Sequence, residues 1–131
     1  MSPANNGGKN VCPTGWHLPS DDDWSILTTY WGGEYVAGGK LKESGTSHWT
    51  LPNDGATNES SFSALPGGFR SSTGFQSIGL IGCWWSSSTY RNINYVTGAL
   101  NRVLGNDFGY VYNGKFGISL KNGNSVRCVK D

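Results

Sequence analysis

The spacing of hydrophobic residues near the start of the chain predicts one well-defined helix. Trp24, Leu27 and Trp31 recur at helical intervals, so they should form a single buried stripe. Ser20 is a favourable N-cap, and the three aspartates at residues 21–23 suit the positive end of the helix dipole. We therefore expect a helix that begins after Ser20 and buries one face.

Glycines and turn-forming residues follow this predicted helix. Gly32 and Gly33 should end it, and residues 36–42 admit a short second helix that is interrupted by glycines. Residues 46–61 are rich in Asn, Asp, Ser, Gly and Pro, which predicts long loops. The pattern thus gives one or two helices followed by irregular structure.

The second half of the chain has the pattern of short strands. Hydrophobic runs between residues 62 and 88 are separated by glycine-containing turns, as in an antiparallel sheet. The Asn113-Gly114 pair stands between two β-prone runs, residues 110–112 and 116–120, which predicts a hairpin. Helices segregated from an antiparallel sheet indicate an α+β fold.

The two ends of the chain each predict a short strand that contains a cysteine. Cys12 lies within residues 10–19 and Cys128 within residues 126–129. We expect these strands to pair in one sheet, and the cysteines to form a disulfide that encloses roughly a hundred residues. The chain has three cysteines, so Cys83 would stay unpaired. The alternative is three buried free thiols in a reducing cell.

Length and composition suit one compact domain. The chain has 131 residues, of which 20 are glycine and 6 are tryptophan, and charged residues make up only 15%. Abundant glycine and aromatic residues with few charges are typical of a loop-rich fold with short strands. We assign residues 10–131 to this domain and residues 1–9 to a linker or trimmed N-terminus.

Charge and hydropathy exclude two classes of partner. The net charge is +1 and the chain has no run of Lys and Arg, so we expect no nucleic-acid partner. No hydrophobic run approaches the roughly 18 residues that cross a bilayer, so we expect no membrane-spanning segment. We recognise no signal sequence in this chain, but an address can be removed, so this does not argue for a cytoplasmic location.

Seven blocks of sequence stand in a distinctive order. They read CPTGWHLPS (12–20), DW (23–24), AGGKLK (37–42), NDGATNES (53–60), FSALPGGFR (62–70), WWSS (84–87) and SVRCVKD (125–131). This order resembles the Fibrobacter succinogenes major paralogous domain over roughly residues 10–131. The resemblance implies a module of a bacterial surface or secreted protein and a C-type-lectin-like fold, with an antiparallel sheet, one or two helices and long loops. It implies no defined chemistry.

The tryptophans should be core residues. Trp16, Trp24 and the pair Trp84 and Trp85 stand within these blocks, and Trp31 shares a helix face with Trp24. We expect Trp16, Trp24, Trp31 and one of the adjacent pair to anchor the core, and not to contact a ligand.

Residues 89–115 depart most from the family pattern, and Cys83 is a further departure. The segment is rich in Tyr and Asn, a composition typical of antibody-like binding surfaces, where rigid rings are combined with adaptable polar groups. It also resembles retroelement-diversified proteins, which carry a variable patch on a C-type-lectin-like scaffold. The alternative is ordinary strand and loop composition. We expect residues 84–115 to display the ligand-binding residues, namely Tyr90, Asn92, Asn94, Tyr95, Asn101, Arg102, Asn106, Tyr110 and Tyr112.

Oxygen-rich segments raise the question of a metal. Residues 51–54 and 105–107 offer ligands of the type that calcium prefers, but neither matches the motifs of sugar-binding C-type lectins. Asn and Asp in turns usually hydrogen-bond the backbone, and residues 21–23 suit a solvated helix start. The cysteines and histidines stand apart, which argues against zinc. We expect no metal and no cofactor.

An enzyme similar to the formylglycine-generating enzymes is a third hypothesis. Residues 67–70 and 126–129 faintly resemble core motifs of those enzymes, whose chemistry needs a close pair of reactive cysteines. With Cys128 bound to Cys12, Cys83 would be alone. No Gly-x-Ser-x-Gly elbow surrounds the serines at residues 86–88. We therefore expect no catalytic activity.

These observations together favour a non-catalytic ligand-recognition module of a bacterial surface or secreted protein, with a protein or glycan partner. The alternative from another class is a structural spacer domain of a larger cell-envelope protein.

Overall fold

The computed structural model describes the backbone of residues 5–6, 9–92, 95–114 and 118–131, and the side chains within 10–90, 98–114 and 118–131. The architecture is α+β, as the sequence predicts. Two consecutive helices, α1 (Asp21–Tyr30) and α2 (Glu34–Leu41), precede most of the strands. Neither helix approaches the length and hydrophobicity needed to cross a membrane, and no other helix occurs among the described residues.

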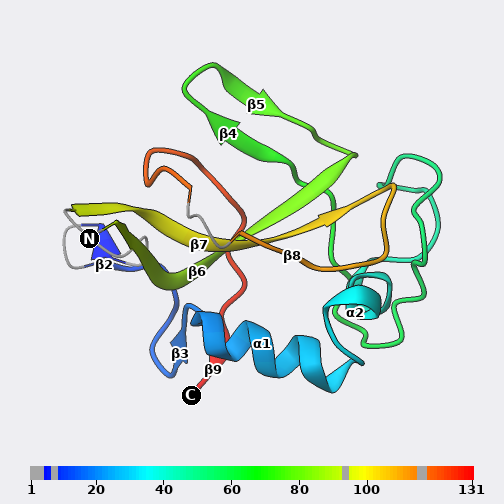
Figure 1. Ribbon diagram of the computed structural model, residues 1–131, viewed down its shortest axis with the longest axis horizontal. Helices are drawn as coiled ribbons and strands as arrows, with labels where there is room; N and C mark the ends of the chain where they lie inside the picture. Colours follow the sequence, from blue (N-terminus) through cyan, green and yellow to red (C-terminus); the bar gives the residue numbers. More distant parts are fainter. Residues whose placement is uncertain (1–4, 7–8, 93–94, 115–117) are drawn as a thin grey trace.

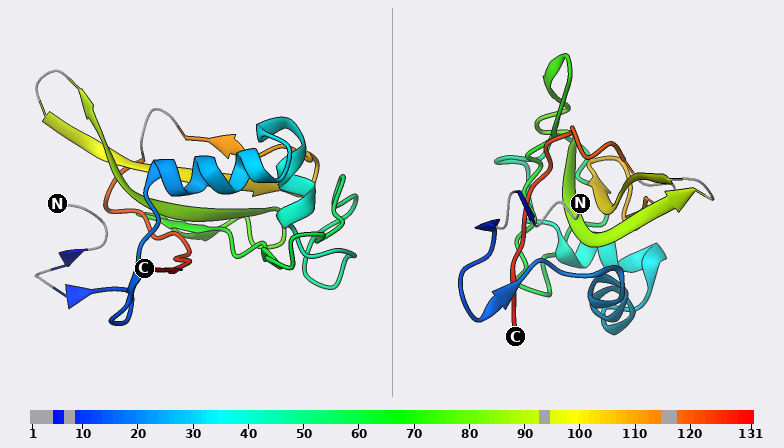
Figure 2. Two further views of the ribbon diagram at one scale, coloured as in Figure 1. Left: turned by 90° about the horizontal axis from the view of Figure 1, so that it is seen from below. Right: turned by 90° about the vertical axis from the view of Figure 1, so that its left-hand side faces the viewer.

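A long antiparallel ribbon forms the centre of the fold. β6 (Ile81–Asn92) pairs with β7 (Tyr95–Gly105), and β8 (Tyr112–Asn113) pairs with the other edge of β7. Helix α1 packs against one side of β6 and β7, while the β4–β5 ribbon (Phe69–Ser71 and Gly74–Gln76) lies on the opposite side (Figure 1). We call the ends of β6 and β7 where Asn92 pairs with Tyr95 the distal ends. They extend past the helices, as Figure 2 shows.

Helix α1 begins as the sequence predicts. Ser20 Oγ accepts a hydrogen bond from Asp23 N at 3.1 Å, and Asp23 Oδ2 accepts one from Ser20 N at 2.9 Å, which completes a capping box. Trp24 is buried, with Leu27 and Trp31 packed against it at the edge of the core. The predicted stripe therefore exists, with its most buried residue at the first turn.

Helix α2 is the predicted second helix, and its glycines allow two loops to approach it closely. A Cβ atom at Gly38 would overlap the backbone of Tyr110, and one at Gly39 would overlap the backbone of Gly55. Gly39 N donates a hydrogen bond to Gly109 O at 2.9 Å. The glycines thus lower helix propensity but bring the loops that contain Gly55 and Tyr110 against the helix.

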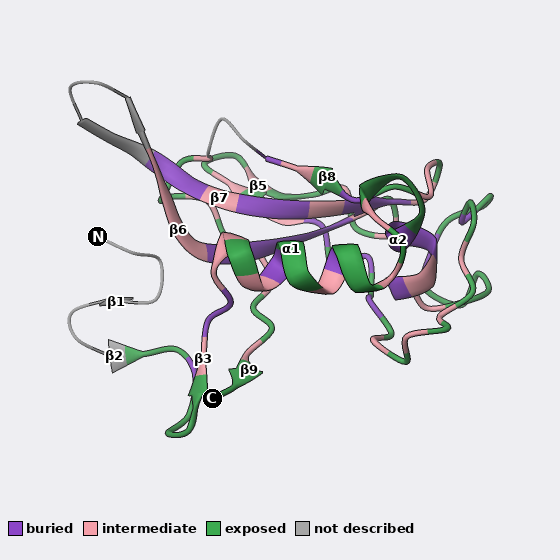
Figure 3. Cartoon of the chain, turned by 60° about the horizontal axis from the view of Figure 1, so that its bottom comes forward, coloured by how far each residue is buried: buried purple, intermediate pink, exposed green. Residues whose placement is uncertain are grey.

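The core lies between the helices and the central ribbon (Figure 3). Trp24 and Trp84 both belong to it, as predicted, and Trp85 belongs to a second buried cluster with the disulfide. Trp49, which sequence reasoning missed, is buried and donates its indole N–H to Ala64 O at 2.9 Å. Trp16 was expected to be a core residue, but it is 42% exposed because its two-residue strand lies at the periphery.

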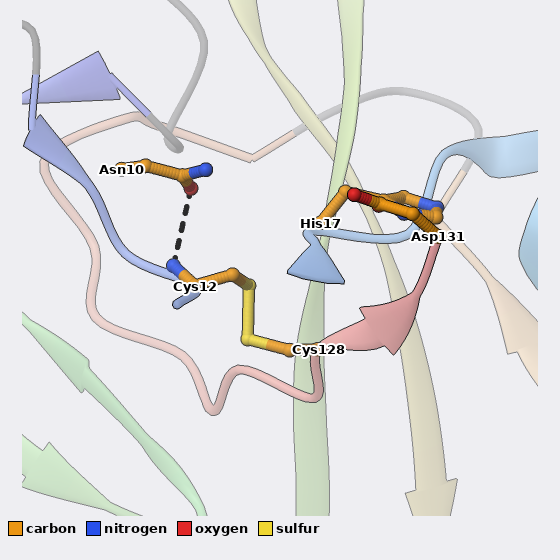
Figure 4. Close-up of a disulfide and its surroundings, with 5 residues drawn as sticks. All are labelled: Asn10, Cys12, His17, Cys128 and Asp131. Carbon is orange, nitrogen blue, oxygen red and sulfur yellow. Dashed lines mark hydrogen bonds and ion pairs between the residues drawn. A yellow bond between two sulfur atoms is a disulfide. The ribbon is translucent and has the colours of Figure 1, made fainter. Parts of the chain in front are cut away.

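The two ends of the chain are joined as the sequence predicts. β3 (Trp16–His17) pairs antiparallel with β9 (Val129–Lys130), and the Cys12–Cys128 disulfide spans 116 residues of sequence with 5.8 Å between the Cα atoms. Figure 4 shows this disulfide beside His17 and Asp131. Cys83 is the free, buried cysteine. We call the β3–β9 pair with its disulfide the terminal clasp.

The N-terminal residues that we assigned to a linker include a short paired segment. β1 (Asn5–Asn6) pairs antiparallel with β2 (Lys9–Asn10), and Asn10 Oδ1 accepts a hydrogen bond from Cys12 N at 3.1 Å. This pair leads directly into the terminal clasp.

The predicted hairpin at Asn113 and Gly114 is wrong. Tyr112 and Ile118, on either side of this pair, both bridge to β7 in the same antiparallel sense, opposite Val103 and Ala99. The chain therefore continues along one edge of β7 and does not fold back on itself. Gly114 N donates to Asn101 O at 3.1 Å, so contacts with β7 override the local turn preference. Residues 115–117 lie outside the described residues.

Replacing Trp24 by alanine should lower the free energy of unfolding by about 3–5 kcal/mol, because a large buried ring would leave a cavity beneath α1. The same replacement of Trp16 should cost clearly less, since that side chain is partly exposed. Urea denaturation monitored by circular dichroism measures both. Equal losses in the two variants would contradict the assignment of Trp24 to the core.

His17 should titrate above its ordinary pKa. Hydrogen bonds to Asp131 Oδ1 at 2.7 Å and then to Asp23 Oδ2 at 3.1 Å raise the pKa of His17 above 6.5, because both ring nitrogens face carboxylates. The stabilisation by protonated His17 is fully present below pH 6.5 and is lost as the pH rises through the raised value. In Asp131→Asn, an NMR titration should show a lower His17 pKa. An unchanged value would rule out this ion pair.

Candidate functional site

The predicted binding residues do not form one continuous patch. They fall into three groups along the central ribbon. Tyr90, Asn92, Asn94 and Tyr95 stand at the distal end, Asn101 and Arg102 lie in the middle of β7, and Asn106, Tyr110 and Tyr112 follow its opposite end. Tyr90 lies opposite Gly98 of β7 and Tyr112 lies opposite Val103, so at ~3.3 Å per residue even these nearest members of the first and last groups are about 17 Å apart along the strand. One small ligand cannot span that distance.

The distal group is only partly described. Tyr90 is partly buried, and it lies on β6 opposite Gly98 of β7. Asn92 and Tyr95 end the two strands as a backbone pair, whereas their side chains and the whole of Asn94 lie outside the described residues. A binding role for these four residues stays a prediction.

The middle group is built into the interior. Arg102 is only 2% exposed, and its Nη1 donates to Asp21 Oδ1 at 2.7 Å and to Asn113 Oδ1 at 3.1 Å. These bonds join β7 and β8 to the first turn of α1. Asn101 is also buried. Ligand contact by either side chain would first require it to leave these surroundings.

The last group forms an exposed aromatic surface. Tyr110 and Tyr112 are 40% and 48% exposed, whereas Val111 between them is buried and donates its N–H to Glu34 O at 2.7 Å. Alternation about a buried residue places both tyrosines on the outer side of the segment. The rings of Phe108 and Tyr110 stack with 4.2 Å between centroids. We call Asn106, Phe108, Tyr110 and Tyr112 the tyrosine surface.

A buried lysine holds the backbone beneath the tyrosine surface. The Lys42 side chain is fully inaccessible to solvent, and its ammonium donates to three backbone carbonyls, Asp54 O at 2.7 Å, Gly105 O at 2.8 Å and Phe108 O at 2.9 Å. The ring centroid of Trp49 lies 5.5 Å from Nζ. All three N–H donors of the ammonium are thus used, by one carbonyl from the loop that contains Asp54, one from the end of β7 and one from the turn that follows β7.

Further hydrogen bonds connect the same loops. Asp54 N donates to Asn106 O at 2.7 Å, and the side-chain Nδ2 of Asn106 donates to Leu51 O at 3.0 Å. The two oxygen-rich segments that we considered for calcium therefore do lie together. Their carbonyls, however, converge on the Lys42 ammonium, so the protein's own cation occupies this position. Among the described residues, no group of three or more His, Cys, Asp or Glu side chains is arranged to hold a metal ion.

Sequence reasoning missed Lys42 because lysine is normally a surface residue. Its position directly after α2 gives no local sign of burial, and the three carbonyls that it binds come from distant segments. Burial lowers the pKa of Lys42 to about 8, and the charges of Asp54 and Asp107 oppose this change. The ammonium form still predominates at neutral pH.

A separate groove of about 400 Å³ runs beside α1 and is lined mainly by apolar side chains, including Ile26, Tyr30 and Phe62. Asp23 is the carboxylate in its lining, and it already accepts hydrogen bonds from Ser20 and His17. The groove contains none of the predicted binding residues.

The stability difference between the wild type and Lys42→Met should depend on pH. Because the Lys42 pKa falls from 10.5 to about 8 on folding, the native state releases this proton first, so wild-type stability should rise relative to the variant between pH 8 and 10.5. The expected gain is roughly 3 kcal/mol, measured by urea denaturation. A constant difference across this range would mean that Lys42 titrates normally in the folded protein.

Comparison with known families and proteins supplies one match. No curated protein and no solved structure matches the chain. The sequence model of the family described as the Fibrobacter succinogenes major domain matches residues 2–130. That span includes both helices, the central ribbon, the terminal clasp and the loops around Lys42. The chain therefore belongs to the Fibrobacter succinogenes major domain family.

Proposed function

We propose that this domain is a non-catalytic recognition module of a bacterial surface or secreted protein, and that it binds a protein or glycan through the tyrosine surface. Family membership fits a domain of a surface protein. The observation that carries the proposal is the Lys42 ammonium, which fixes the backbone on which exposed aromatic side chains stand.

A fixed backbone matters because binding costs conformational entropy. Tyrosine supplies a large contact area with few rotatable bonds, so a pre-ordered pair loses little freedom when a ligand binds. Tyr110 and Tyr112 flank the anchored Val111, and Phe108 stacks on Tyr110. The Asn106 carbonyl and amide are already bonded to the neighbouring loop, which leaves the aromatic rings as the main contact area.

Several features support recognition over catalysis. Cys128 is bound to Cys12, and burial raises the pKa of the Cys83 thiol to about 11, so Cys83 offers little thiolate near neutral pH. The paired reactive cysteines of a formylglycine-generating enzyme are therefore not supported by this arrangement. A disulfide that joins the chain ends also suits an oxidising location such as the cell surface.

The structural spacer remains the alternative from another class. A spacer would need the same disulfide and rigid core but no exposed aromatic surface. A binding role for Tyr90, Asn92, Asn94 and Tyr95, at the distal ends of β6 and β7, stays a separate prediction.

The double variant Tyr110→Ala/Tyr112→Ala should lose binding on arrays of glycans and of immobilised surface proteins. We expect at least a tenfold loss of affinity, which corresponds to about 1.4 kcal/mol, because the rings form the centre of the contact. The melting temperature should change little, since both side chains are exposed.

The matched control is Tyr30→Ala/Tyr35→Ala, which removes two tyrosines that are also exposed but lie on α1 and α2. This control should bind as the wild type does. Absence of any array ligand for the wild type, or equal losses in both double variants, would favour the spacer function.

A further inference from the structure

A second cavity is lined by residues of β4, β5 and the segment 123–125. The β4–β5 ribbon lies on the side of the central ribbon opposite α1 (Figure 1). The cavity has a volume of about 280 Å³. Glycines form much of its wall, and the side chains that give it chemical character are Arg70, Phe75, Asn124 and Ser125. None of the predicted binding residues lines this cavity, and none of its lining residues is acidic.

Arg70 and Phe75 contact each other at the cavity, where both side chains can contact a ligand. They are directly opposite each other in the register of β4 and β5, and the guanidinium carbon lies 5.8 Å from the ring centroid. Phe75 is 74% exposed, which is unusual for a phenylalanine on a small domain. The guanidinium makes no hydrogen bond or ion pair with any described residue, so its donors are available to a ligand.

Asn124 supplies a second, independent sign of a ligand. Its amide nitrogen and oxygen are both shielded from solvent and have no hydrogen-bond partner among the described residues. A buried amide without partners is costly, and such groups are rare in folded proteins. A polar group bound in the cavity would supply the missing partner once the Asn124 side chain turns toward it.

The backbone on either side of Asn124 is held firmly. Gly123 exchanges two hydrogen bonds with Arg70, each 2.8 Å long. Ser125 N donates to Cys83 O at 2.9 Å, and Ser125 O accepts from Trp85 N at 3.0 Å. Asn124 is therefore fixed between β4 and β6, and the unpaired amide is not the product of a loose loop.

We propose that this cavity binds a carboxylated pyranose, a uronic acid. The apolar face of the sugar ring would lie on Phe75, and the carboxylate would pair with the Arg70 guanidinium. Ring hydroxyls would bond Ser125 and, after the Asn124 side chain turns toward the cavity, its amide. A guanidinium binds a carboxylate through two parallel charge-assisted bonds, which a neutral sugar cannot offer. The cationic, acid-free lining therefore favours the acidic sugar over its neutral counterpart.

The test is NMR titration of the intact domain with galacturonic acid and with trigalacturonate, compared with galactose and with the methyl ester of trigalacturonate. Both acids should shift the amide signals of Gly68, Gly123 and Asn124, and should bind at least tenfold more tightly than the uncharged probes. Tighter binding of the trimer would identify a polysaccharide chain as the natural source, whereas equal binding would identify the free sugar acid; either outcome supports the site. Equal binding of charged and uncharged probes, or no shifts at millimolar concentrations, would overturn the proposal.

Single-residue variants test whether galacturonate binds in this cavity. Arg70→Ala and Phe75→Ala should each weaken galacturonate binding at least tenfold, and Asn124→Ala should weaken it without lowering stability, because an unpartnered amide is removed. Arg127→Ala is the matched control, since its guanidinium also lies over an aromatic ring, that of Phe62, but outside this cavity. A comparable loss in Arg127→Ala, or none in Arg70→Ala, would refute the assignment.

This site is separate from the tyrosine surface. Tyr110→Ala/Tyr112→Ala should bind galacturonate as the wild type does. Failure of either proposal therefore leaves the other intact.

Discussion

The buried ammonium of Lys42 is the interaction on which the candidate binding surface depends. It stands at the point where the end of α2, the loop that contains Asp54 and the turn after β7 meet, and it bonds a carbonyl from each of three residues in those loops. Removing a cation from water is costly, and three carbonyl bonds together with the nearby Trp49 ring offset part of that cost, since the Lys42 pKa is still lowered to about 8. Without the ammonium, three buried carbonyls would lack a donor. The ammonium and the three carbonyls each satisfy the other's hydrogen bonds, so the loops are stabilised in this one arrangement.

Other contacts in the fold also stabilise the loops around Lys42 and the central ribbon. Gly38 and Gly39 let the loops lie directly against α2, and Arg102 joins β7 and β8 to the start of α1. The terminal clasp closes the chain through the Cys12–Cys128 disulfide and β3–β9 pairing. The central ribbon thus has α1 on one side and the β4–β5 ribbon on the other (Figures 1 and 2).

Local sequence signals predicted the features that depend on local chemistry. The capping box at Ser20, the buried position of Trp24, the glycine-containing α2 and the pairing of the chain ends all followed from residue type and spacing. The predicted hairpin at Asn113 was wrong because both flanking segments pair with β7 and not with each other. The prediction that Trp16 is a core residue was wrong because its two-residue strand lies at the periphery, where neither face is covered by the core.

The site was harder to predict because its parts are distant in sequence. The Tyr and Asn residues of 89–115 looked like one surface, but a strand as long as β7 carries its two ends far apart. Arg102 has the chemistry of a ligand contact yet bonds Asp21, 81 positions away in sequence. Lys42 and Asn124 gave no signal at all, because burial of a lysine or an unpaired amide appears only once the surrounding segments are in place.

Hydrogen exchange of single amides in Lys42→Met tests the central claim most directly. The amides of Asp54, Gly39 and Val111 bond the loops to each other and to α2, whereas the Leu104 amide belongs to the central ribbon. If the ammonium orders these loops, the first three amides should exchange at least ~10-fold faster in the variant while Leu104 keeps its protection. Unchanged protection at Asp54, Gly39 and Val111 in a folded Lys42→Met domain would contradict the account.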